Sequence, residues 1–124
     1  MLVTLYRALG VFIFEMLTGH APFEDKTGQE DKIFKNILRG QVTQPVGISA
    51  EAWDLISRLL HSEAPGRFGC QCAGSLDVQG HRWFKGTDFV QLSVCEVKPP
   101  FIPVLRSRGD FSHFPHATKT TRGD

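Results

Sequence analysis

An apolar run at the N-terminal end limits the possible folds of this chain more than any other feature. The run, MLVTLYRALGVFIFEML, covers residues 1–17 and contains only two charged residues, Arg7 and Glu15. It is too short and too interrupted to span a bilayer, and no convincing cleavage site of small residues follows it, as a signal peptide would require. Because a helix that is apolar on all sides belongs in a protein core, we expect a buried helix over residues 5–18.

The rest of the pattern predicts a mostly α-helical body. Apolar residues recur at helical spacing over residues 29–39, and Gly40 follows as a natural helix end. A third helix is expected to start at Ser49, a good N-cap residue. Its apolar stripe consists of Trp53, Ile56, Leu59 and Leu60. A short helix is expected near residues 76–80, and the proline-rich stretch after Thr87 predicts an extended, irregular tail.

Composition excludes several classes of function. The chain has 124 residues and a formal net charge of +1, so no strong attraction to nucleic acid or to a membrane surface is expected. Its three cysteines, Cys70, Cys72 and Cys95, are too few and too widely spaced for a disulfide framework. Cys70, Cys72 and His81 do not have zinc-site spacing, so we expect no metal site. Reduced thiols indicate a cytoplasmic location.

Five segments carry a family resemblance by their order and spacing. They are LGVFIFEMLTGHAPFE, IFKNILRGQV, ISAEAWDLISRLLHSEAPGRFG, HRWFKGTDF and PPFIP. In this order they resemble the C-terminal part of the large lobe and the C-terminal tail of a eukaryotic Ser/Thr protein kinase. Within that superfamily the resemblance is to the AGC group, nearest the cyclic-nucleotide-dependent kinases. The resemblance implies a mostly α fold with an extended irregular tail.

The resemblance also implies a domain organisation. Residues 8–86 correspond to a partial large lobe with four helices, and residues 87–124 correspond to the AGC-kinase tail. Residues 1–7 are unmatched, because the family places aspartate and tryptophan where this chain has Leu5-Tyr6-Arg7. We therefore expect that this chain is a fragment whose start falls within a domain.

The resemblance assigns roles to residues of the first helix. Phe12 and Met16 occupy positions where the family anchors its catalytic spine, which makes them structural. Glu15 stands where the nearest relatives place a carboxylate that pairs with a substrate arginine; the alternative is an ordinary solvent-facing residue. Because the family packs this helix against catalytic and activation segments not found here, we also expect it to expose apolar surface.

Three further structural roles follow from the same resemblance. Arg67 corresponds to an arginine that forms a buried ion pair with the glutamate of an Ala-Pro-Glu motif, which this chain lacks. Here Arg67 is expected to stay hydrated, to pair with Glu63, or to await a partner outside the chain. His81 and Trp83 correspond to structural residues that pack the last helix.

Two positions carry the implied ligand and partner contacts. Phe114 lies near the tail phenylalanine that the family folds over the adenine pocket, although Pro115 and His116 replace the usual neighbours. The second predicted helix, with Phe34, corresponds to one that docks regulatory partners in the family. From its helical spacing we favour core packing for Phe34 and keep contact with a protein substrate or regulatory subunit as the alternative.

The missing motifs define the expected activity. Phosphoryl transfer needs a glycine-rich loop, a His-Arg-Asp loop and an Asp-Phe-Gly segment, and none occurs in this sequence. ATP and magnesium are therefore implied by the family only; we expect neither to bind this chain alone, and we assign no catalytic residue. The alternative is a non-catalytic interaction module. The two Arg-Gly-Asp tripeptides at residues 108–110 and 122–124 suggest a third possibility, a secreted adhesive protein, which the absence of a secretory signal disfavours.

Overall fold

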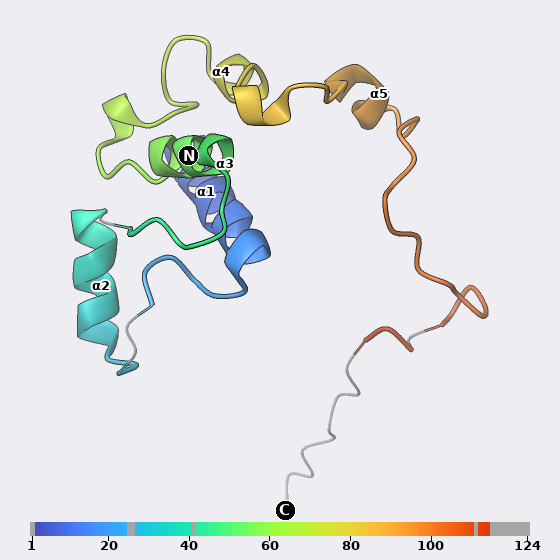
Figure 1. Cartoon of the computed structure of the whole chain (residues 1–124), viewed down its shortest axis with the longest axis horizontal. Coiled ribbons are helices and arrows are strands. Elements are labelled where there is room, and N and C mark those ends of the chain that lie inside the picture. Colours follow the sequence, from blue (N-terminus) through green and yellow to red (C-terminus); the bar gives the residue numbers. More distant parts are fainter. Residues whose placement is uncertain (1, 25–26, 41, 111, 115–124) are drawn as a thin grey trace, which may run out of the picture. The chain divides into compact units, whose positions relative to one another are not determined.

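The computed structural model describes residues 2–24, 27–40, 42–110 and 112–114, with side chains from Thr4 onward. These residues form helices and loops and contain no strand, which confirms the mostly α fold (Figure 1). The elements in chain order are α1 (Leu2–Thr18), α2 (Glu30–Arg39), α3 (Ala50–Leu59), the 3₁₀ turn η1 (Ala64–Gly66), α4 (Ser75–Gln79), the 3₁₀ turn η2 (Arg82–Phe84) and α5 (Phe89–Ser93). The chain divides into two compact units, Met1–Phe89 and Val90–Asp124.

The core of the first unit forms where α1 crosses α3. The two helices approach so closely that a Cβ added to Gly10 would stand 2.8 Å from Leu59 Cβ and 3.0 Å from Leu60 Cδ2. Five residues of the α3 segment are almost completely buried: Ala52, Leu55, Ile56, Leu59 and Leu60. Around them the core cluster is completed by Ile13, Phe14, Phe23 and Val78. Because α3 also contacts η2, it is the central helix of this unit.

Helix α1 is buried on one side only, so the expectation of burial on all sides is wrong. Ile13 and Phe14 face the core, whereas Leu5, Phe12 and Met16 are 59%, 58% and 71% exposed. The apolar pattern of this helix does not show which of its sides another helix covers, so it could not predict the exposed side. The exposed side agrees with the apolar surface that the kinase resemblance implied.

Helix α1 also begins at Leu2, earlier than the predicted residue 5, and so includes most of the unmatched segment.

Helix α3 follows its prediction closely. The Ser49 hydroxyl accepts a hydrogen bond from the Ala52 amide at 3.2 Å and so caps the first turn. Three of the four predicted stripe residues are fully buried, and Trp53 is half-buried against the core. Leu55, which the predicted stripe omitted, is fully buried as well. The burial of this helix rests on both α1 and the segments that follow it.

Helix α2 agrees with its predicted range but not with its predicted burial. It ends at Gly40, whose φ of 62° is left-handed and whose amide bonds to the Asn36 carbonyl. Its apolar residues were expected to form a core face, yet the helix contains no buried residue. Phe34 is 63% exposed, so core packing for Phe34 is wrong. Ile37, by contrast, packs against the core.

The second unit is irregular over most of its described length, as the proline-rich pattern predicted. One helical turn was missed: α5 spans Phe89–Ser93, inside the region expected to lack helix. At five residues this helix is too short to produce a recognisable apolar period. Further along, a loop closes where His113 Nε2 lies 3.1 Å from the Val104 carbonyl.

The close approach of α1 and α3 generates a stability prediction. We expect Gly10→Ala to lower the free energy of unfolding by about 1–3 kcal/mol, because the new methyl overlaps Leu59 Cβ, which the backbone holds in place. The better helix propensity of alanine offsets about 1 kcal/mol of that loss. Urea denaturation followed by circular dichroism measures the difference.

Ala8→Gly is the matched control for that experiment. Ala8 is exposed on the same helix, so this change isolates helix propensity and should cost about 1 kcal/mol. A Gly10→Ala protein more stable than the parent would contradict the close α1–α3 contact.

Candidate functional site

The loop that follows α3 is organised around a buried arginine. Arg67 is only 4% exposed. Its Nε donates to the His61 carbonyl and its Nη2 donates to the Ser62 carbonyl, both at 2.9 Å. These carbonyls lie just beyond the C-terminal end of α3, where a cation is favoured by the helix dipole. The expectation of a hydrated Arg67 is therefore wrong.

Aromatic rings fill the space beside two glycines of the same loop, where a side chain would otherwise lie. The ring of Tyr6 lies where a Cβ on Gly69 would be, with its nearest atom 2.4 Å from that position, and Gly69 has a left-handed φ of 85°. The His61 ring occupies the corresponding space at Gly66, at 2.7 Å. No other residue type fits these positions without displacing a ring. Tyr6 therefore anchors the loop from α1.

Arg7, the neighbour of Tyr6, connects α1 to α2. Its guanidinium donates to the Ile37 carbonyl and lies 5.5 Å from the ring centroid of Phe23. Burial lowers the pKa of Arg7 below its usual value, and the nearby charge of Arg67 lowers it further. The segment at residues 5–7 is thus built into the fold through two of its three side chains.

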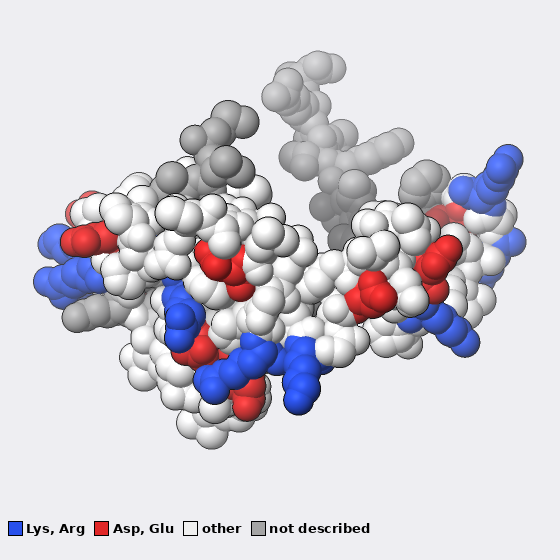
Figure 2. All heavy atoms as spheres, turned by 90° about the horizontal axis from the view of Figure 1, so that it is seen from above, with Lys and Arg blue, Asp and Glu red and all other residues white. Residues whose placement is uncertain are grey.

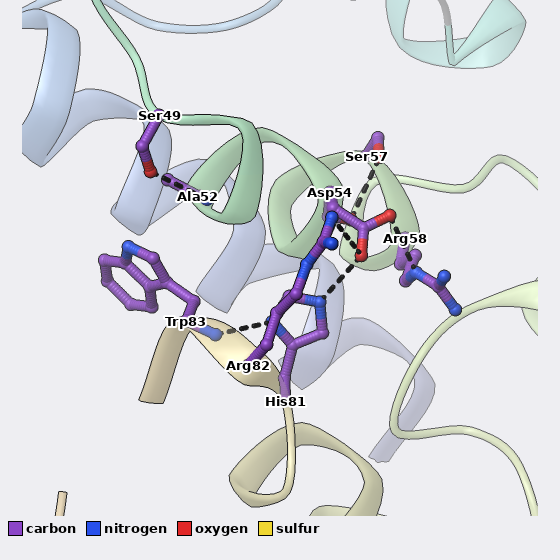
Figure 3. A network of polar contacts seen from close by, with 8 residues as sticks. All are labelled: Ser49, Ala52, Asp54, Ser57, Arg58, His81, Arg82 and Trp83. Carbon is purple, nitrogen blue, oxygen red and sulfur yellow. Dashed lines mark hydrogen bonds and ion pairs between the residues drawn. The ribbon is translucent and has the colours of Figure 1, made fainter. Parts of the chain in front are cut away.

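A second polar cluster joins α3 to the η2 turn (Figure 3). His81 is 8% exposed, and its Nε2 lies 2.9 Å from Asp54 Oδ2. Its Nδ1 accepts a hydrogen bond from the Trp83 amide at 3.2 Å. Since Nδ1 accepts, Nε2 carries the proton and donates to the carboxylate. Both ring nitrogens of His81 are therefore committed to the fold, which suits a structural role.

Two arginines approach the same carboxylate. Arg58 Nε donates to Asp54 Oδ1 at 3.1 Å, and Arg82 Nη2 lies 3.5 Å from Oδ2. The hydrogen bond from His81, followed by the hydrogen bond and charge of Arg58 and the charge of Arg82, holds the pKa of Asp54 below its usual value. Asp54 is thus the common partner of three side chains from two elements.

A hollow of about 830 Å³ lies beside the C-terminal end of α1. It is lined by Phe14, residues 20–22, Glu24, Asn36 and residues 43–46. Glu15, which follows Phe14, is exposed. An exposed carboxylate at the end of this helix is accessible to a guanidinium in solution.

The other residues named from the sequence are dispersed. Phe12 and Met16 lie on the exposed side of α1, and Trp83 is half-buried with its ring centroid 4.9 Å from that of Phe84. Phe114 belongs to the second unit and is 66% exposed.

The first Arg-Gly-Asp tripeptide uses its acidic group locally. Asp110 accepts hydrogen bonds from the amides of Arg106 and Ser112, both at 2.8 Å. These bonds, with that from Arg106 as the largest effect, hold the pKa of Asp110 below its usual value. The second tripeptide, at residues 122–124, lies outside the described residues.

The residues that the structure describes contain no cluster of metal ligands and no membrane-spanning helix. Within residues 2–24, 27–40, 42–110 and 112–114, His, Cys, Asp and Glu side chains form no group of three or more that fits a metal ion. In the same part of the chain no helix has the length and apolarity that crossing a bilayer demands. Figure 2 shows acidic and basic side chains interspersed on the visible face, in keeping with the net charge of +1.

Comparison with curated proteins gives 259 matches at a stringent threshold. The cAMP-dependent protein kinase catalytic subunit of Dictyostelium discoideum is 42% identical over 107 residues, covering 86% of this chain and 16% of that protein. The human cAMP-dependent protein kinase catalytic subunit PRKX is 37% identical over 107 residues, covering 86% of this chain and 29% of that protein. Rat protein kinase C eta type is 36% identical over 108 residues, covering 86% of this chain and 16% of that protein.

The chain is homologous to AGC-group protein kinases. It spans 16–29% of the length of these three relatives. No protein-family model matches the chain. The homology agrees with the helical fold, which is that expected of the large lobe of an AGC kinase.

Sequence reasoning missed two residues that organise the site. The sequence does contain a signal for Asp54: Asp54 and Arg58 are four residues apart on one predicted helix, so they share a face and can form an ion pair. Tyr6 gave no local signal, since its contact with Gly69 is between residues far apart in the sequence.

Asp54 makes stability depend on pH in a defined direction. A carboxyl group whose pKa is lowered by folding stabilises the protein above the unfolded value of about 4 and loses that contribution as the pH falls through the lower folded value. We expect Asp54→Asn to lower the free energy of unfolding by about 1 kcal/mol at pH 7, because the amide still accepts from His81 but carries no charge. Urea denaturation should show this difference shrinking as the pH falls below about 4.

Glu63→Gln is the control for the Asp54 experiment, because Glu63 is an exposed loop residue. It should change stability by less than about 0.5 kcal/mol. If the deficit of Asp54→Asn were the same at pH 7 and at pH 2, the charge on Asp54 would not be what stabilises the fold.

Proposed function

We propose that this chain carries part of the large lobe of an AGC-type Ser/Thr protein kinase and transfers no phosphate by itself. The observation that supports the kinase assignment is identity of 34–42% to named cAMP-dependent kinase subunits over 86–94% of the chain. Mostly α structure with an irregular tail is compatible with it.

The proposed inactivity rests on missing chemistry. The 124 residues contain no glycine-rich phosphate loop, no His-Arg-Asp aspartate and no Asp-Phe-Gly aspartate. In kinases these supply the phosphate cradle, the residue that accepts the hydroxyl proton and the magnesium ligands. The residues present therefore do not fit ATP and magnesium.

We assign to Glu15 the binding of an arginine in the protein substrate. Glu15 is exposed near the end of α1. It follows Phe14, which is one of the residues that line the 830 Å³ hollow. A carboxylate binds a guanidinium through two parallel charge-assisted hydrogen bonds, which gives both affinity and orientation.

A phosphotransfer assay tests the proposed inactivity. Purified chain incubated with radiolabelled ATP, magnesium and an arginine-containing serine peptide should label no peptide above a reaction without protein. Labelled peptide that depends on the chain, and that disappears with Glu15→Ala, would contradict the proposal.

The same peptide tests the role of Glu15 independently of phosphotransfer. We expect Glu15→Gln to weaken peptide binding about tenfold, measured by fluorescence anisotropy, because one charge-assisted pair is lost. Glu63→Gln is the matched control and should leave binding unchanged. Equal affinity of Glu15→Gln and the parent chain would remove Glu15 from the substrate site while leaving the kinase assignment intact.

A second candidate function is a non-catalytic interaction module that binds a protein partner, such as a substrate or regulatory subunit, through α2. The supporting observation is the exposure of Phe34 and Leu38, at 63% and 78%. Large apolar side chains on a solvent-facing helix are typical of protein interaction surfaces.

A further inference from the structure

One surface of α2 combines apolar and charged side chains in an ordered way. Its centre is formed by Phe34 and Leu38, which are four residues apart and therefore neighbours on the helix surface. Asp31 lies in the first turn, and Lys35 and Arg39 lie in the later turns; all three are exposed. We call these five residues the α2 face.

The α2 face is available because α2 is held to the protein through residues outside this face. Ile37 packs against the core, and its carbonyl accepts a hydrogen bond from Arg7. No residue of α2 is buried. In Figure 1, α2 stands at the margin of the helices of the first unit.

Charge gives the α2 face a direction. Asp31 and Arg39 are eight residues apart, which corresponds to about 12 Å along a helix. The face is therefore negative toward one end and positive toward the other, with Phe34, Leu38 and Lys35 between the two ends. A surface with this order is complementary to a copy of itself that runs in the opposite direction.

We propose that the α2 face binds the α2 face of a second copy of this chain, with the two helices antiparallel about a two-fold axis. In that arrangement the apolar pair of each copy covers the apolar pair of the other, and Asp31 of each copy lies beside Arg39 of the other. Lys35 lies beside Lys35 of the other copy, so two opposite-charge contacts outweigh one like-charge contact. A parallel arrangement would bring like charges together at residues 31, 35 and 39, which is less favourable. Two-fold pairing is also the commonest closed symmetry of protein assemblies, because one patch serves both partners.

The contact is small, which sets its expected strength. One ten-residue helix from each copy buries less than the standard interface, so the dimer is weak and concentration-dependent. Its charge pairs lie at the surface, so added salt weakens it further. The proposal deepens the interaction-module candidate by naming the occupant, and it stands apart from phosphotransfer.

Reversing one charge at a time provides the test. Asp31→Lys places a lysine beside Arg39 of its partner, and Arg39→Asp places two aspartates together, so each variant alone should dimerise at least tenfold more weakly than the parent chain. In an equal mixture of the two variants, the introduced lysine of one chain lies beside the introduced aspartate of the other. The unchanged Arg39 of the first chain then lies beside the unchanged Asp31 of the second, so the mixture should recover the parent's dimer. Sedimentation velocity of the full chain at low salt measures the three samples, with circular dichroism to confirm unchanged helix content.

Two leucines provide the matched apolar comparison. Leu38→Asp places a charge in the centre of the α2 face and should abolish the dimer. Leu76→Asp alters a comparably exposed leucine of α4, 68% against 78%, and should leave the dimer intact. If other exposed apolar surfaces produce larger assemblies, energy transfer between fluorophores on Asp31→Lys and Arg39→Asp should still exceed that within either variant alone.

Three results would overturn the proposal. They are a parent chain that stays monomeric at millimolar concentration, a mixture of charge variants that associates no better than each variant alone, and loss of the dimer on Leu76→Asp but not on Leu38→Asp. A parent chain that is monomeric yet binds a foreign protein through Leu38 would assign the surface to a different partner. A negative result here leaves the phosphotransfer and peptide-binding experiments unaffected.

Discussion

The contact between α1 and α3 at Gly10 is the interaction on which the rest of the first unit depends. Only a residue without a side chain lets Leu59 and Leu60 approach α1 at this distance. That approach buries the apolar stripe of α3 and fixes the helix in position. Asp54 of α3 binds His81 before η2, and the Arg67 loop begins where α3 ends. The position of α3 therefore determines where both polar clusters lie.

The two polar clusters then attach the later segments to the central helix. Arg67 returns the loop to carbonyls beyond the C-terminal end of α3, and Tyr6 covers Gly69 of the same loop. Asp54 binds His81 and so brings the η2 turn against α3. Tyr6 contacts this loop and Arg7 bonds to the Ile37 carbonyl of α2, so the segment at residues 5–7 is part of the folded structure.

Local sequence patterns predicted the positions of the helices well, but they predicted poorly which surfaces of the helices are buried. Ser49, Gly40 and the α3 stripe follow rules that act within a few residues, so the ends and inner side of α3 were predictable. Burial of Phe34 was not, because helical spacing shows that apolar residues share a face but not that anything covers it. The Asp54–His81 pair joins residues 27 positions apart. Such pairs depend on how the chain folds back, which spacing cannot supply.

The helices differ in how firmly the rest of the first unit holds them, and native-state amide hydrogen exchange measures that difference directly. Amides of α3 should open only with the whole first unit and show the highest protection, with α1 from Gly10 to Phe14 close behind. Amides of α2, which has no buried residue, should exchange through local opening at a lower free energy. Protection in α2 equal to or above that in α3 would contradict the claim that the α1–α3 contact at Gly10 organises this protein.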